Sequence, residues 1–301
     1  MSAAADYFPA ALRLAAWWET QCTCDPGTVE HSKQCLVAAI FSACCEPRAG
    51  LDDEAFIAAK CCLLFFLVDD GSVDQLTTFD RFLEEGGAAD PGGSEAAVCY
   101  LSLLADLGSR GCHADELTTA IRMWSAAMRA EQCLDPAYLM PQTYAVLRKE
   151  TIFVSCLIQC WLALLHVAVP EDFSAECTRV TDLAIRIVIL VNDLGSLRND
   201  EEPTPRVPGA LVDINSVLTR ARVLGSRCEA VRQAIDEHNV LVAELRTAQQ
   251  DLLLRCGHVS WAAVFLDVVR GVVGGNLRGT RDLTAQRYPG AGELLQKLDP
   301  L

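Results

Sequence analysis

The sequence is short of basic residues. Its 301 residues include 25 Lys and Arg against 40 Asp and Glu, so the formal net charge is −15 and the isoelectric point is about 4.7. A surface this acidic repels polyanions, which argues against nucleic acid or an anionic membrane as a partner. A chain of this charge that binds an anionic ligand must neutralise that ligand locally.

The sequence also lacks the pattern of β-strands. No stretch alternates apolar and polar residues with a period of two, and no internal repeat or break in composition divides the chain. Apolar residues make up 51% of the sequence, which is enough for a sizeable core. We therefore expect one all-α domain over residues 1–301, folded as a helical bundle around a central cavity.

No Cys-x-x-Cys pair occurs, although the chain has 15 cysteines. The count is odd, and the first residues do not resemble a signal peptide. Pairs such as Cys44-Cys45 and Cys61-Cys62 fall inside apolar helical runs. We therefore interpret most cysteines as reduced core residues of a cytoplasmic protein. A zinc site is the alternative, and the spacing does not support it.

A convincing membrane span is also missing. The longest apolar run, Phe153–Pro170, has the length of one, but Gln159 and His166 interrupt it and no second span follows. We expect a buried central helix over Thr151–Val169 and no stable membrane insertion. His166 is then expected to be a core or rim histidine rather than a ligand.

Apolar residues three and four positions apart, with Pro and Gly at the breaks, predict the helices. The expected segments are Met1–Asp25, His31–Cys45, about Glu54 to Asp69, Thr77–Glu85, Glu95–Leu107, Ala114–Cys133, Thr151–Val169, Ala175–Arg198, Val212–Leu224, Glu229–Cys256 and Ser260–Arg278. We expect a mobile loop at Glu201–Ala210, which holds three prolines.

Three polar residues follow the apolar run Leu183–Val191. Asn192, Ser196 and Asp200 are spaced i, i+4, i+8, which places their side chains on one helix face, each about 6 Å further along the axis. An amide oxygen, a hydroxyl and a carboxylate are hard oxygen ligands of the kind that Mg²⁺ prefers. The alternative is a solvated helix end without a bound ion.

A second acidic stretch ends the apolar helix that begins near Glu54. Asp69 and Asp70 come at its end, and Asp74 is expected to share a helix face with Asp70 at i, i+4. Acids are unfavourable at a helix C-terminus, and buried ones are costly unless they are paired or bind a cation. The alternative is an acidic loop.

Basic residues suited to an anionic group occur in two further stretches. Arg148 lies in Tyr144–Thr151, just before the long apolar run, and Gly275–Thr280 runs on towards Arg287 and Tyr288. Arginine and a phenol can both donate hydrogen bonds to anionic oxygens.

These four stretches, in this order, resemble the motifs of class I terpene synthases of the microbial, single-domain type. The similarity extends from about Phe65 to Tyr288. In that family an aspartate-rich motif and an Asn-Ser-Glu triad face each other across a helical bundle. The resemblance implies a site for three Mg²⁺ ions at Asp69, Asp70, Asp74, Asn192, Ser196 and Asp200, and a diphosphate site at Arg148, Arg198, Arg287 and Tyr288. Phe65 and Phe66 lie one turn before Asp69 and are expected to face the cavity as catalytic aromatic residues.

Several positions depart from the family pattern. Asp200 stands where Glu is usual, and Glu201 beside it competes for the third place of the triad. Arg198 is expected to replace a Lys that is common one position later. The family has a diphosphate-sensing arginine, which Arg148 matches, and a small Gly usually breaks the helix shortly after it. Ile152 and Phe153 stand in that place here.

Gly279 stands where a Trp is usual. The absence of that indole predicts a larger cavity, with Phe65, Phe66 and Trp161 as the rings that guide a cation. The alternative is that another side chain, such as Leu283, fills the gap.

The resemblance implies an Mg²⁺-dependent cyclase. It would ionise farnesyl or geranylgeranyl diphosphate, cyclise the carbocation to a sesqui- or diterpene and release pyrophosphate. Two alternatives stay open: a prenyl chain-elongating synthase, which normally carries a second Asp-rich motif, and a non-catalytic helical binding protein. The substrate chain length and a homodimer are left open.

Overall fold

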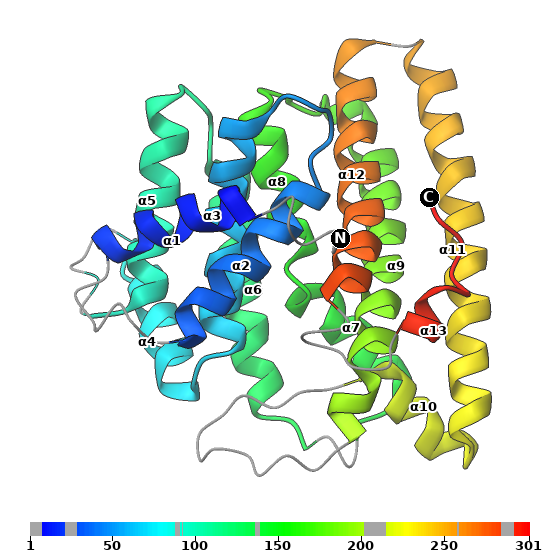
Figure 1. The fold of residues 1–301 in the computed structure, drawn as a ribbon. Coiled ribbons are helices and arrows are strands. Elements are labelled where there is room, and N and C mark those ends of the chain that lie inside the picture. The colour runs from blue at the N-terminus through cyan, green and yellow to red at the C-terminus, as the bar shows by residue number, and fades with distance from the viewer. Residues whose placement is uncertain are drawn as a thin grey trace.

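The computed structural model describes residues 8–21, 29–87, 91, 93–135, 139–201, 215–257, 259–283 and 292–301. These segments consist of helices and turns and contain no β-strand (Figure 1). The expected all-α fold is therefore confirmed for the described part of the chain.

Most of the helices follow one another with short connections. Their bounds are α1 Phe8–Gln21, α2 Val29–Cys44, α3 Asp52–Asp69, α4 Val73–Glu84, α5 Glu95–Ser109, α6 Asp115–Gln132, α7 Pro141–Thr151, α8 Val154–Leu164, the 3₁₀ turn η3 Glu171–Phe173, α9 Ser174–Glu201, α10 Ser216–Leu224, α11 Arg227–Cys256, α12 Ser260–Leu283 and α13 Gly292–Leu295. Most expected segments match these helices to within a few residues. The exceptions are Met1–Asp25, of which only Phe8–Gln21 is described, the segment around α7 and α8, and α13, which was not expected.

Two groups of helices form the bundle. The long helices α9, α11 and α12 pack side by side, and α1, α2, α3 and α5 pack together on the other side (Figure 1). The short helix α8 lies between the groups and contacts α3, α6, α9 and α12. It is almost entirely apolar and most of its residues are buried, so it forms the centre of the core.

The expectation of one central helix over Thr151–Val169 is wrong. Helix α7 ends at Thr151, α8 spans only Val154–Leu164, and Phe153 between them has φ 65°. A bulky residue in this left-handed region is strained, so tertiary packing must hold it there. The ring of Phe153 packs 4.7 Å from Trp124 and 5.4 Å from Phe65, measured between ring centroids. The helix thus breaks after Arg148 even without a glycine.

The far end of α8 also differs from the expectation. His166 has φ 52° and is exposed, and the next backbone N–H, that of Val167, donates to the Leu162 carbonyl. This pattern terminates a helix and is usually built with Gly. His166 is therefore a helix-ending residue on the exposed rim of the bundle; of the two expected positions, core or rim, the core is excluded. None of the helices in the described ranges is long and apolar enough to cross a membrane.

Glycines on α12 allow a close approach to α2. Gly271, Gly275 and Gly279 are spaced by four residues and lie on one face. A Cβ added at Gly275 would stand 2.3 Å from the Cys44 carbonyl oxygen, and one at Gly271 would stand 2.8 Å from that of Cys45. At Gly279 a Cβ would meet the Phe41 ring at 3.2 Å. The space beside Gly279 is therefore filled by Phe41 rather than left open, and the side chain of Leu283 is not among the described ones.

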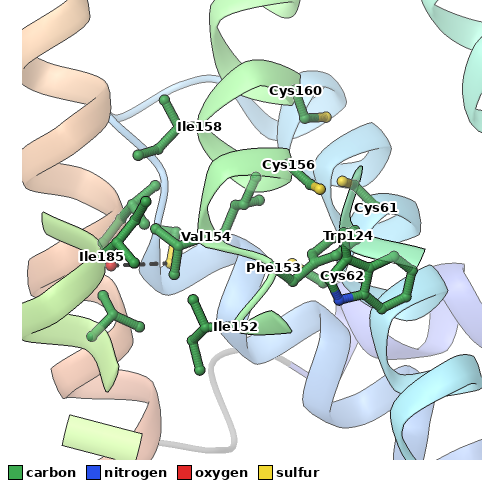
Figure 2. Packing of buried hydrophobic residues seen from close by; sticks show 14 of the residues in the cluster. Cys61, Cys62, Trp124, Ile152, Phe153, Val154, Cys156, Ile158, Cys160 and Ile185 are labelled. Atoms are coloured by element: carbon green, nitrogen blue, oxygen red, sulfur yellow. Dashed lines mark hydrogen bonds between the residues drawn. The ribbon is translucent and has the colours of Figure 1, made fainter. Parts of the chain in front are cut away.

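The interpretation of the cysteines as core residues is confirmed. Ten of the thirteen described cysteines are buried, and all thirteen are free thiols. Figure 2 shows Cys61 of α3 with Cys156 and Cys160 of α8 gathered in the core. Burial raises the pKa of the Cys61 and Cys156 thiols well above the usual range, and that of Cys35 to about 12, so these three thiols are protonated and poor nucleophiles.

Candidate functional site

The acidic stretch at the end of α3 divides between two helices. Asp69 is the last residue of α3 and half-buried, whereas Asp70 is exposed. Ser72 starts α4 with a capping box, its hydroxyl accepting from the Gln75 backbone N–H at 3.2 Å. Asp74 lies exposed in the first turn of α4. The expectation that Asp70 and Asp74 share one helix face is therefore wrong, because the chain turns between them.

Glycine is needed at that turn. A Cβ added at Gly71 would lie 2.8 Å from the Leu67 carbonyl oxygen and 2.8 Å from Oε1 of Gln75. The turn orients Asp69, Asp70 and Asp74 differently, so only Asp69 is half-buried within the bundle.

The polar face of α9 is formed as expected. Asn192, Ser196 and Asp200 are all half-buried, and the Ser196 hydroxyl donates to Oδ2 of Asp200 at 2.6 Å. This contact places Asp200 on the same side of the helix as Ser196, in agreement with the i, i+4 spacing. The side chain of Glu201 is not among the described ones.

Arg148 lies among acidic groups from three other helices. The charges of Glu131 on α6, Asp193 on α9 and Asp69 on α3 all act on its guanidinium. Burial alone would lower the pKa of Arg148, but these neighbours, together with Tyr144, raise it instead. Its Nε is buried and has no hydrogen-bond partner among the described residues. Arg148 thus connects the acidic end of α3 with the polar helix α9.

Asp193 and Tyr144 were missed as site residues by sequence reasoning. The Tyr144 hydroxyl donates to both carboxylate oxygens of Asp193, at 2.8 and 2.7 Å, and both side chains are buried. Burial raises the pKa of Tyr144 well above its usual range, and the negative charge of Asp193 adds to this, so the phenol stays protonated. Asp193 follows Asn192 directly, and its place on the inward face of α9 was the signal that could have identified it.

Two asparagines outside the expected motif also contact it. Asn276 of α12 donates to Oδ1 of Asn192 at 3.3 Å, and Asn215, just before α10, donates to Oδ2 of Asp200 at 2.7 Å. Both asparagines are buried. No local spacing links them to α9, so only the fold reveals their role.

Aromatic side chains lie one turn before Asp69 on α3. Phe65 is half-buried and its ring centroid lies 5.1 Å from that of Phe66, which is 6.0 Å from Phe41. Phe153 and Trp124 extend this cluster. Trp161, expected to be a further ring near the site, is fully buried in α8, and its ring is not part of this cluster of described aromatic side chains.

The other residues expected to bind the diphosphate lie in different surroundings or outside the described residues. Arg287 and Tyr288 lie outside the described residues, as does most of Glu201–Ala210. Arg198 is exposed near the end of α9. Arg278 donates to the Cys44 carbonyl oxygen at the C-terminus of α2, so this residue of Gly275–Thr280 binds the chain itself.

A groove of about 660 Å³ lies elsewhere on the molecule. It runs between α6, α8 and the first half of α9, with Gln159, Leu162 and Thr181 in its lining. None of the expected site residues lines it. The candidate site is therefore defined by converging polar groups and not by this groove.

Sequence comparison identifies no relative: no model of a known protein family and no curated protein matches. The fold does have known counterparts. 2-Methylisoborneol synthase from Streptomyces coelicolor A3(2) superimposes with a TM-score of 0.74 at 18% identity, over 93% of this chain and 90% of that one. Linalool/nerolidol synthase from Streptomyces clavuligerus, in complex with 2-fluorogeranyl diphosphate, gives 0.72 at 17% identity, over 91% and 98%.

The SVS_A2 protein from ancestral sequence reconstruction is also similar, with a TM-score of 0.74 at 17% identity over 97% of this chain and 93% of that one. The structural similarity extends over nearly the whole length of each chain, although the sequence identity is too low for sequence comparison to detect a relationship. The chain has the all-α fold of the class I terpene synthases.

Proposed function

We propose that the protein is an Mg²⁺-dependent class I terpene synthase. The observation that carries the proposal is the position of Arg148: the residue is half-buried among charges that include Asp69 of α3 and Asp193 of α9, and its Nε is buried and has no described partner. A buried donor of this kind suits the oxygen of an anionic ligand. A protein of the same fold binds a prenyl diphosphate analogue, which supports a prenyl diphosphate as that ligand.

The polar residues fit Mg²⁺. Asn192, Ser196 and Asp200 offer oxygen atoms only, and the bond between the last two shows that their oxygens converge. Asp69 adds a half-buried carboxylate from α3, and Asp70 and Asp74 add exposed ones around the turn. When bound, Mg²⁺ supplies charge neutralisation of the diphosphate as it leaves.

The protein's own groups have three tasks in this reaction. Arg148, with Arg198, Arg287 and Tyr288, would hold the diphosphate oxygens and stabilise the charge that develops on them. Phe65 and Phe66 would exclude water from the carbocation and present ring faces to it. No general base is needed for the ionisation step, because the bond to the diphosphate breaks without proton transfer.

The direct test is incubation with C10, C15 and C20 prenyl diphosphates and Mg²⁺, followed by gas chromatography of the extract and a pyrophosphate assay. We expect cyclic hydrocarbons or alcohols, and no turnover in excess chelator. Asp69→Ala and Asn192→Ala should abolish turnover, whereas Asp52→Ala, at the exposed start of the same helix α3, should not. Absence of turnover with all three substrates would refute the proposal.

The same experiment separates the alternatives. A chain-elongating synthase would yield longer diphosphates rather than hydrocarbons, and α9 carries Asn192 and Ser196 instead of a second cluster of acids. A non-catalytic binding protein would release no pyrophosphate. Farnesyl diphosphate leads among the substrates, with geranylgeranyl diphosphate next, and Phe41 beside Gly279 favours the shorter one by filling space.

A further inference from the structure

Asn215 contacts both α10 and α9. Its Oδ1 accepts from the backbone N–H groups of Val217 at 2.9 Å and Leu218 at 3.4 Å, so it caps the N-terminus of α10. Its Nδ2 donates to the Asp193 carbonyl oxygen at 2.8 Å and to Asp200 Oδ2 at 2.7 Å.

The orientation of this amide is fixed by its neighbours. Backbone N–H groups can only donate, so the amide oxygen must face α10, and the two N–H bonds must then face α9. The Ser196 hydroxyl, 3.3 Å from Nδ2, shares these donors with the two oxygens at shorter distance. Asn215 is 2% exposed, so water does not compete for any of these contacts. Asp lacks the donors and Ser cannot fill both roles with one hydroxyl, so Asn is suited to this position.

These hydrogen bonds hold two side chains of the α9 motif (Asn192, Ser196 and Asp200) in one geometry. Ser196 donates to Asp200 Oδ2 at 2.6 Å, and the same oxygen accepts from Asn215. Two hydrogen bonds to Oδ2 thus restrain the Asp200 carboxylate, and the Ser196 hydroxyl, which gives its proton to Asp200, keeps its lone pairs to accept or to ligate. Asn276 acts similarly at the other end of the motif, where it donates to Oδ1 of Asn192 at 3.3 Å.

We propose that Asn215 is a positioning residue that fixes Ser196 and Asp200 for binding of Mg²⁺ and diphosphate. The inference rests on the proposed function. It assigns the task of ordering the metal ligands to a residue that lies outside the α9 motif, at the start of the next helix. Because oriented ligands lose less entropy on binding, removal of the Nδ2 donors should weaken Mg²⁺ binding more than it weakens the fold.

The test compares Asn215→Ser with Asn215→Ala. Serine is a good N-cap and keeps an acceptor for α10, but it loses the paired donors to α9. Ser226→Ala is the control, because Ser226 caps α11 through the Glu229 N–H and makes no described contact with the motif. Each purified protein is titrated by calorimetry with inorganic pyrophosphate in the presence of Mg²⁺, and its thermal unfolding is followed without ligand.

We expect pyrophosphate affinity to fall at least tenfold in both Asn215 variants and to stay within twofold of the wild type in Ser226→Ala. The unfolding temperature should fall less in Asn215→Ser than in Asn215→Ala. Higher Mg²⁺ should restore binding to Asn215→Ser, which a purely structural defect would not show. If the wild type binds and Asn215→Ser binds equally well, the inference is wrong and the proposed function stands. If the wild type itself shows no Mg²⁺-dependent binding, both fail.

Discussion

Tyr144→Phe is the most informative single change for the packing of this site. It deletes one oxygen atom and leaves the ring, so no cavity larger than that atom forms. The lost hydroxyl donates to both oxygens of Asp193, which is 1% exposed. The other described donor to this carboxylate is the Ser216 backbone N–H, 3.0 Å from Oδ2. A buried carboxylate therefore loses one of its few hydrogen-bond donors.

The magnitude follows from the charge of the acceptor. A hydrogen bond to a charged group contributes about 1.5–3 kcal/mol, and both partners here are buried, so we expect destabilisation in this range. For a chain of this size about 2 °C is lost per kcal/mol, which predicts a drop in the unfolding temperature of about 3–6 °C. The measurements are urea unfolding for the free energy and thermal unfolding for the temperature, each followed by far-UV circular dichroism.

Tyr100→Phe is the matched control. Tyr100 is also buried, at 2% exposure, but its hydroxyl lies 3.5 Å from the neutral Thr118 hydroxyl, at the limit of a hydrogen bond. We expect this variant to lose less than about 0.5 kcal/mol. Equal stability of the two variants would refute the reasoning. A double-mutant cycle with Asp193→Asn would then show whether the phenol and the carboxylate are coupled at all.

Three further predictions concern the fold. Gly275→Ala should destabilise the fold by about 1–3 kcal/mol or more, because the added Cβ would overlap the Cys44 carbonyl. Gly274→Ala should instead stabilise the helix by about 0.5–1 kcal/mol, because its Cβ would meet only the flexible Arg278 side chain at 3.5 Å. Urea unfolding of the two variants measures the difference. Asp106→Asn should destabilise the fold more than Lys60→Met, because it leaves the buried Lys60 ammonium without its carboxylate partner. Since Asp106 is 34% exposed, the loss should stay below the roughly 3–5 kcal/mol expected for a fully buried pair. Burial lowers the pKa of His238, so the unfolded chain binds the proton more tightly and the free energy of unfolding decreases below about pH 6.5. In His238→Gln the free energy of unfolding should depend less on pH between about pH 7 and 5, and an unchanged slope would contradict this.

The sequence predicted the helices whose apolar residues follow one period without conflict. The long helices α9 and α11 and the ends of α5 and α6 were expected to within a few residues. The spacing of Asn192, Ser196 and Asp200 was sufficient to place them on one face, because a helix is a local structure with a fixed rise and turn. The same local argument predicted that the cysteines lie in the core.

Tertiary structure decided the rest, where distant groups override local preference. The break at Phe153 exists because Trp124 and Phe65 pack against its ring, and an apolar run by itself gives no sign of it. The close contact of α12 with α2 depends on which face the glycines present to Cys44 and Phe41. Likewise Asn215 and Tyr144 reach α9 from other helices, 15 and 49 residues away from the carboxylates they bind. A hydrogen bond between such positions depends on how the helices dock, which the local periodicity of a sequence does not encode.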